Sequence, residues 1–277
     1  ALINLVIEVA LIIVLDCGIG ASALWTVIAQ WCGALVYVAL VGAEARRHQV
    51  GLAPHLGRIA IQLRVGSALI VRTVALRSIF LMAVAVAGRM GTVELAAYQI
   101  GIGVWTFLAF AYDGIETAGQ ALVARELGGR RSDEARSAAG RVLLWAIGAS
   151  VVLGVVTLLG QRVLAGLFSS DDVGVAAAAG ALCWVGVGQP IAGPAYALDG
   201  VLVGAGDLRF LAGAMLAVTV TFGAGAALTL STGAGLWALW ATLLVSMAVR
   251  TALMSRRFRS GAWVRTGLPA TIERGQF

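Results

Sequence analysis

Long apolar blocks alternate with short charged or glycine-rich turns along this 277-residue chain. Blocks of about 20 apolar residues match the hydrocarbon thickness of a bilayer. The stretches 142–160 and 211–230 contain no charged residue. The pattern therefore predicts an all-α polytopic membrane protein. The eight expected helices span approximately residues 1–15, 21–42, 66–88, 93–124, 139–161, 173–203, 208–230 and 234–255.

The distribution of arginine predicts how these helices are oriented. The segments 43–65, 125–141, 204–210 and 256–277 contain 15 of the 20 arginines, whereas the connections on the opposite side contain two. Cytoplasmic loops of membrane proteins carry the excess of basic residues. We therefore expect these four segments, and with them the C-terminus, to face the cytoplasm of a bacterial inner membrane.

An internal repeat predicts the domain organisation. Residues 15–25 and 230–240 share six identical residues at eleven aligned positions, and each copy joins two apolar blocks. Glycine turns and interfacial tryptophans are common in membrane proteins, but the matching topology favours a parallel duplication of a six-helix unit.

The first copy of the repeat should also close a six-helix unit, but only two helices of that unit are present. About four further helices are therefore expected upstream. The first block is also too short to cross a bilayer, which is typical of a chain that starts inside a helix. The predicted parts are the last two helices of an N-terminal bundle (1–42), a cytoplasmic basic linker (43–65), a C-terminal six-helix bundle (66–255) and a cytoplasmic tail (256–277).

Composition excludes several classes of protein. Hydrophobic residues make up 60% of the chain and charged residues only 12%, whereas soluble domains contain about 25% charged residues. All 20 basic residues are arginine, so a Walker A lysine and a lysine Schiff base are both excluded. The arginines lie between apolar blocks and not on one polar face, which argues against a nucleic-acid partner. We expect no enzymatic activity, no cofactor and no bound metal apart from a transported ion.

Polar side chains inside the first two blocks form one candidate site. Asn4 and Glu8 are four residues apart and share a helix face. Thr26 follows a tight turn and can approach them. Because burial favours the protonated form of a carboxylate, Glu8 could load and release a proton, or its oxygens could hold a cation. The alternative is that Glu8 extends to the interface or pairs with another helix.

A second set of polar residues lies in the C-terminal bundle. Asp113 and Glu116 share a face of one predicted helix, and Asp199 lies in a helix that also contains Pro190 and Pro194. Carboxylates beside a broken helix are typical of transport pathways. The alternative is structural, with these carboxylates paired to the intramembrane residues Arg72 and Arg77.

Four short runs give the chain a resemblance to a known family. They lie at 95–100, 119–125, 189–190 and 198–207. Together they resemble the MATE (multidrug and toxic compound extrusion) family, and most closely its DNA-damage-inducible protein F branch. The resemblance covers essentially all of the chain, as helices five to twelve of the family's twelve.

The resemblance implies a function and site residues. Family members export amphipathic or cationic compounds in exchange for H⁺ or Na⁺ by rocking two bundles around a central cavity. Related members bind the coupling ion with an Asn-x-x-x-Asp pair of helix five and a threonine of helix six, which correspond to Asn4, Glu8 and Thr26. Glu8 replaces the aspartate, so the identity of the coupling ion, Na⁺ or H⁺, stays open. The resemblance also suggests a C-bundle pathway, with the candidate residues Asp113, Glu116, Gln189 and Asp199.

Two alternatives remain open from the sequence. Arg72, Arg77 and Arg250 lie within apolar blocks and would suit an exporter of a lipid-linked or anionic intermediate, since an anion needs cationic partners. The other alternative is a truncated, non-transporting membrane fragment. The expected partners are small-molecule substrates, a coupling ion and the lipid bilayer, with the protein acting as a monomer.

Overall fold

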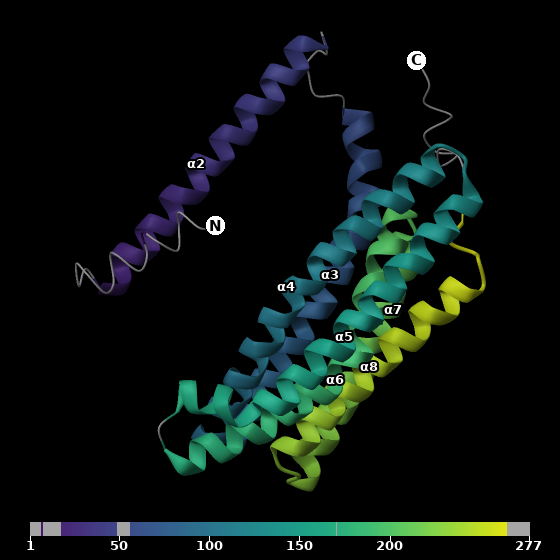
Figure 1. Cartoon of the computed structure of the whole chain (residues 1–277). Helices are drawn as coiled ribbons and strands as arrows, with labels where there is room; N and C mark the ends of the chain where they lie inside the picture. The colour runs from purple at the N-terminus through teal and green to yellow at the C-terminus, as the bar shows by residue number, and fades with distance from the viewer. Residues whose placement is uncertain (1–6, 8–17, 49–55, 170, 265–277) are drawn as a thin grey trace. The chain divides into compact units, whose positions relative to one another are not determined.

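The computed structural model describes residues 7, 18–48, 56–169 and 171–264, and in these ranges it is helical (Figure 1). Within the described ranges, seven helices are long and apolar enough to cross a membrane. This confirms the predicted all-α membrane fold, while the helix predicted at 1–15 falls outside the described residues except for residue 7. The helices are α2 (Gly18–Arg47), α3 (Leu56–Met90), α4 (Thr92–Gly128), α5 (Ser132–Phe168), α6 (Asp172–Gly204), α7 (Leu208–Thr232) and α8 (Leu236–Arg259).

Several helices continue beyond the apolar blocks that predicted them. Helix α3 begins at Leu56, not near 66, and α5 begins at Ser132, not near 139. The predicted loop 125–141 is thereby reduced to residues 129–131. Alanine, arginine and glutamate are strong helix formers. Hydropathy therefore marks where a helix crosses the membrane and misses where the helix itself ends.

The chain divides into two compact units, Ala1–Ala60 and Ile61–Phe277. The described part of the first unit is mainly α2, which ends in charged residues. There Glu44 accepts a hydrogen bond from the ring of His48, with a distance of 2.9 Å between Oε1 and Nε2. The large apolar side chains along α2 are exposed.

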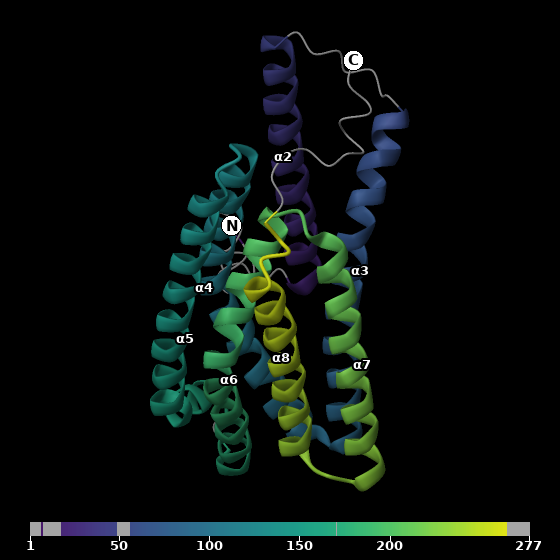
Figure 2. The same ribbon diagram turned by 90° about the vertical axis from the view of Figure 1, so that its right-hand side faces the viewer.

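The second unit is a bundle in which consecutive helices run in opposite directions. Helix α6 lies at its centre and packs against α4, α5 and α8. Figure 2 shows α4 and α5 on one side of the bundle and α3 and α7 on the other. The last two are joined by a hydrogen bond from Thr219 Oγ1 to the carbonyl of Ala75, at 3.1 Å.

Three arginine-bearing segments meet at one end of this bundle. Arg257 at the end of α8 donates a hydrogen bond from Nε to Asp207 in the α6–α7 connection, at 2.6 Å. Trp263 packs in one cluster with Leu127 and Ala135, which flank the α4–α5 turn. The structure thus places at one end the segments that the arginine count assigns to one side of the membrane. That this end faces the cytoplasm stays a prediction.

Glycines allow α6 to approach its neighbours at backbone distance. A β-carbon on Gly200 would collide with the backbone of Glu116 in α4, and one on Gly204 with the backbone of Gln120. Small residues of this kind let transmembrane helices pack closely. The contact at Gly200 also fixes the height of Glu116 relative to the neighbouring residue Asp199.

We predict that Gly200→Ala destabilises the bundle, because the new methyl group must push α4 away from α6. The expected loss in free energy of unfolding is about 1–3 kcal/mol, the usual cost of overpacking. Unfolding in detergent micelles followed by circular dichroism measures it. The matched control is Gly180→Ala on the same helix, where a β-carbon meets no atom within 4 Å. If both variants unfold alike, the close approach does not hold α4 against α6.

Candidate functional site: a buried charge cluster

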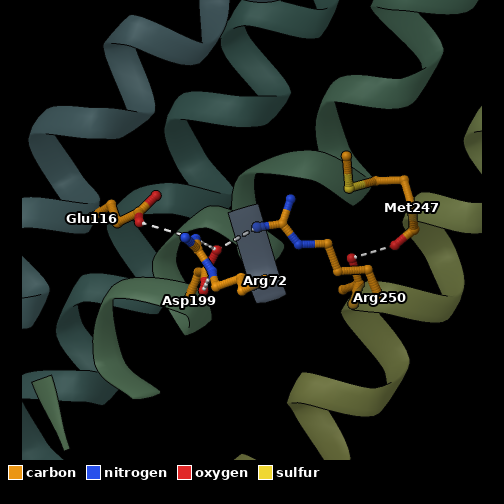
Figure 3. A network of polar contacts seen from close by, with 6 residues as sticks. Arg72, Glu116, Asp199, Met247 and Arg250 are labelled. Carbon is orange, nitrogen blue, oxygen red and sulfur yellow. Dashed lines mark hydrogen bonds and ion pairs between the residues drawn. The ribbon is translucent and has the colours of Figure 1, made fainter. Parts of the chain in front are cut away.

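Asp199 of α6 is the centre of a cluster of charged side chains inside the bundle. Its side chain is fully buried, with 0% of its surface exposed. Arg72 of α3 donates to it from both Nε, at 3.1 Å to Oδ1, and Nη2. Arg250 of α8 donates from Nη2 to Oδ2 at 2.5 Å. One carboxylate therefore ties three helices together (Figure 3).

Glu116 of α4 adds a fourth helix through a looser contact. Its Oε1 lies 3.8 Å from Nη2 of Arg72, and about a fifth of its side chain is exposed. This distance is an ion pair without a direct hydrogen bond. Of the two carboxylates, Glu116 is consequently the one that can lose its charge while the Asp199 hydrogen bonds stay in place.

Arg250 is enclosed almost completely, with 3% of its side chain exposed. Its guanidinium carbon lies 5.3 Å from the ring centre of Tyr196, over the face of the ring. Such a contact stabilises a cation beyond its ion pair. Figure 3 shows Arg250 extending from α8 toward the carboxylate that Arg72 also contacts.

An uncharged polar pair lies near this cluster in α4 and α6. Tyr112 donates a hydrogen bond from its hydroxyl to Gln189 Oε1, at 2.9 Å, and both side chains are buried. Gln189 in turn donates from Nε2 to the carbonyl of Val185, at 3.0 Å. The Tyr112 ring stacks on Tyr196, with ring centres 5.3 Å apart. The stacked tyrosines connect this pair to the cluster, because Tyr196 also contacts Arg250.

The prolines in α6 do not interrupt this arrangement. Pro190 and Pro194 both lie inside one continuous helix, Asp172–Gly204. Nearby, Thr251 Oγ1 of α8 donates to the carbonyl of Ile191 at 2.9 Å. This hydrogen bond joins α8 to the backbone of α6 beside the prolines.

The structure brings some of the predicted site residues together and leaves others apart. Glu116 and Asp199 meet in the charge cluster, and Gln189 is buried beside it. Asp113 is exposed on α4. Of the predicted N-bundle site, Asn4 and Glu8 lie outside the described residues and only Thr26, in α2, lies within them.

The ion pairs agree in part with the structural alternative drawn from the sequence. Arg72 pairs with both Asp199 and Glu116 as that alternative required. Arg77 is exposed, and in the described part of the chain no ion pair joins it to a carboxylate. Arg250 was not predicted from the sequence as a partner of Asp199. One signal in the sequence could have indicated this pair. Asp199 and Arg250 are each an isolated charge within an apolar stretch, and each therefore needs a counter-charge.

With all four groups ionised, the cluster is electrically balanced. Two arginines face two carboxylates, and Asp199 lies at hydrogen-bond distance from both arginines. Taking such charges out of water costs several kcal/mol per ion, which only close pairing offsets. Uptake of a proton or a cation at either carboxylate would upset this balance and weaken the ties between α3, α4, α6 and α8.

Comparison with known proteins identifies the family. The MatE family model matches residues 68–229. The chain belongs to the MATE family. Its matched region includes Arg72, Glu116 and Asp199, whereas Arg250 follows it. The resemblance stated from short sequence runs is thereby confirmed.

The matching relatives include a plant protein and a bacterial protein. Protein DETOXIFICATION 43 of Arabidopsis thaliana is 29% identical over 261 residues, which cover 94% of this chain and 49% of that protein. DNA damage-inducible protein F of Escherichia coli is 28% identical and is matched over 95% of this chain and 58% of its own length. This MATE chain therefore spans roughly half the length of the curated relatives it matches.

Solved structures show the same fold at lower sequence identity. A multidrug resistance MATE family transporter in its outward-facing conformation matches with a TM-score of 0.69 and 18% identity, covering 74% of this chain and 46% of the other. A MOP superfamily transporter from Pyrococcus furiosus matches with a TM-score of 0.66 and 18% identity, over 70% and 43%. These likenesses support the fold of the six-helix bundle.

We predict that Asp199→Asn strongly destabilises the bundle, because it removes the carboxylate partner of Arg250 and leaves Arg72 with only its 3.8 Å contact to Glu116. Removing one partner of a buried ion pair costs about 3–5 kcal/mol. The free energy of unfolding in detergent measures the effect. Asp113→Asn is the matched control, since it makes the same chemical change at an exposed position and should shift stability by no more than about 0.5 kcal/mol. Equal losses in the two variants would contradict a stabilising role for the cluster.

Proposed function

We propose that the complete protein is a secondary antiporter that exports amphipathic or cationic organic compounds in exchange for H⁺ or Na⁺ by alternating access. Membership of the MATE family supports transport, and one structural relative is described as a multidrug resistance transporter. The observation that carries the proposal is the charge cluster on Asp199, because ionisable groups inside a membrane are costly and typically serve transport.

The cluster offers a physical basis for ion coupling. Asp199 and Glu116 hold α3, α4, α6 and α8 through Arg72 and Arg250. A proton or cation that neutralises a carboxylate releases an arginine and so favours a different arrangement of these helices. Ion and substrate are coupled only to the extent that each binds one arrangement more tightly than the other.

A second location for coupling remains a prediction from the sequence. Asn4, Glu8 and Thr26 match the family pattern for an ion site in the N-terminal bundle. The two locations differ in chemistry, since Glu8 is predicted beside an amide and a hydroxyl, whereas Asp199 has arginine partners. Substitution at each location can therefore separate them.

Export of an anionic compound is the second candidate function. It is supported by Arg72 and Arg250, two cationic side chains inside the bundle. The Pyrococcus furiosus relative is described as having a binding pocket of reverse polarity, which suggests a different function for that transporter. Because pocket charge varies within this fold, an organic anion belongs beside the organic cation among the substrates to be assayed.

We predict that Glu116→Gln reduces gradient-driven efflux at least tenfold while the protein stays folded, because glutamine keeps the side-chain shape but cannot exchange a proton. The measurement is efflux of a fluorescent organic cation from proteoliposomes that contain the full-length protein, with H⁺ and Na⁺ gradients imposed separately. Thr117→Ser, beside Glu116 in α4, serves as a control that should retain efflux.

The variant Glu8→Gln decides which bundle carries the coupling. Loss of efflux in Glu116→Gln alone places coupling in the charge cluster, and loss in Glu8→Gln alone overturns that role and places it in the N-terminal bundle. No efflux of the cation with either gradient in the unsubstituted protein contradicts cation export. Uptake or efflux of a labelled organic anion would then support the second candidate.

A further inference from the structure

An open groove of about 600 Å³ lies between α6 and α8. Figure 2 shows the two helices next to each other, and they pack together in the bundle. The residues that α8 contributes are spaced three and four apart or adjacent to one another, so they share one face of that helix. The lining consists of Pro190 and Ile191 of α6 with Ala248, Thr251, Ala252, Ser255, Arg256 and Arg259 of α8.

This groove is separate from the charge cluster. Ala248 and Ala252 are each two residues away from Arg250, which places them about 200° around the helix from it. Arg250 extends toward Asp199 in the interior of the bundle, whereas both alanines are exposed. The groove therefore opens on the outer surface of the bundle, on the opposite side of α8 from the ion pairs.

The length of the groove matches one leaflet of a bilayer. From residue 248 to residue 259, α8 rises by about 16 Å at 1.5 Å per residue, and the hydrocarbon core of a bilayer is about 30 Å thick. Pro190 and Ile191 lie near the middle of α6, and Arg259 is the last residue of α8. The groove thus extends from about the midplane to the level of the lipid headgroups.

Two arginines give the surface end of the groove a positive charge. Arg256 and Arg259 are both exposed, and among the described residues no ion pair joins either of them to a carboxylate. Arg257, which lies between them in the sequence, is instead held by Asp207 at 2.6 Å. A guanidinium binds phosphate with two parallel hydrogen bonds. This end of the groove therefore suits a phosphate group.

The deeper part of the groove is apolar and already formed. Thr251 Oγ1 donates a hydrogen bond to the carbonyl of Ile191 at 2.9 Å, which joins the two walls. Ala248 and Ala252 have small side chains and leave space beside α8. A ligand that enters a preformed groove does not have to separate the helices, which lowers the cost of binding.

We propose that this groove binds an anionic phospholipid of the leaflet at the arginine-rich end of the bundle. The phosphate lies at Arg256 and Arg259, and one acyl chain follows α8 past Ala252 and Ala248 toward the midplane. Basic pockets between transmembrane helices bind anionic lipid headgroups in this way. The site requires a charge and a hydrocarbon chain together, and a membrane lipid has both.

Other occupants fit this lining less well. An exported organic cation would meet two arginines of its own sign. Pockets for drug-sized molecules are lined by aromatic side chains, whereas no described residue of this lining is aromatic. A helix of a second copy could pack closely on Ala248 and Ala252, but it would also have to bring carboxylates to the arginines.

Lipid binding to the full-length protein in detergent tests the headgroup contact. Native mass spectrometry should show tighter binding of phosphatidylglycerol than of phosphatidylcholine with the same acyl chains. The double variant Arg256→Gln/Arg259→Gln should weaken phosphatidylglycerol binding by about thirtyfold, since each basic residue near an anionic headgroup contributes a factor of roughly five. The matched control Arg46→Gln/Arg47→Gln removes two exposed arginines from the end of α2 and should keep the affinity.

A second pair of variants tests the acyl chain. Ala252→Leu fills the groove and should weaken phosphatidylglycerol binding, whereas Ala217→Leu makes the same change at an exposed position of α7 and should not. Equal affinities in these two variants would overturn the placement of the chain. Displacement of the lipid by inorganic phosphate would show a site for a free anion and overturn the lipid assignment. Equal binding of the two lipids would overturn recognition by charge.

Electron cryomicroscopy of the full-length protein in nanodiscs that contain phosphatidylglycerol shows what occupies the groove. We expect density for an acyl chain beside Ala252 and for a headgroup beside Arg256 and Arg259. A helix of the N-terminal bundle or of a second copy in this place would overturn the proposal, and so would an empty groove. These experiments measure lipid binding, so their outcome is independent of whether the protein exports an organic cation.

Discussion

The bundle depends on a carboxylate that has no access to water. Asp199 lies inside α6, and its oxygens accept hydrogen bonds from Arg72 of α3 and Arg250 of α8. Without these partners the charge would be too costly to bury, and without the charge Arg250 would lose its carboxylate partner in an apolar interior. Apolar packing gives little preference between helices in a membrane, because lipid tails are as apolar as leucine. The charge cluster therefore specifies which helices meet and at what height.

Close backbone contact makes the cluster possible. Gly200 follows Asp199 directly and lets α6 lie against the backbone of Glu116, so the second carboxylate comes within reach of Arg72. Gly204 repeats the contact one turn further along α6, against Gln120. A larger side chain at either position would move α4 outward and lengthen an ion pair that is already 3.8 Å long. Packing and electrostatics thus depend on the same short segment of α6.

Hydropathy and arginine placement were enough to predict the helices α2 to α8 and the end of the bundle at which the arginine-rich segments meet. They failed at helix ends, as at Ser132, because arginine and alanine continue a helix after it leaves the membrane. The sequence also singled out Glu116 and Asp199, since charges in apolar helices are rare. It could not show that Arg250 and not Arg77 completes the cluster. That choice depends on helix rotation and on packing between segments about fifty residues apart, which a one-dimensional pattern does not contain.

Arg250 connects the two polar features of the bundle. One nitrogen of its guanidinium binds Asp199, and the guanidinium carbon lies over the ring of Tyr196, which stacks on Tyr112 of the buried Tyr112–Gln189 pair. A change at one contact must therefore affect the other, because the guanidinium is rigid and moves as one plane. If Asp199 releases Arg250, the contact with Tyr196 changes as well. A proton on Glu116 removes its ion pair with Arg72 and leaves the charge of that arginine to Asp199, so the protonation state of α4 influences how tightly Asp199 holds Arg250 and thereby the position of the stacked tyrosines.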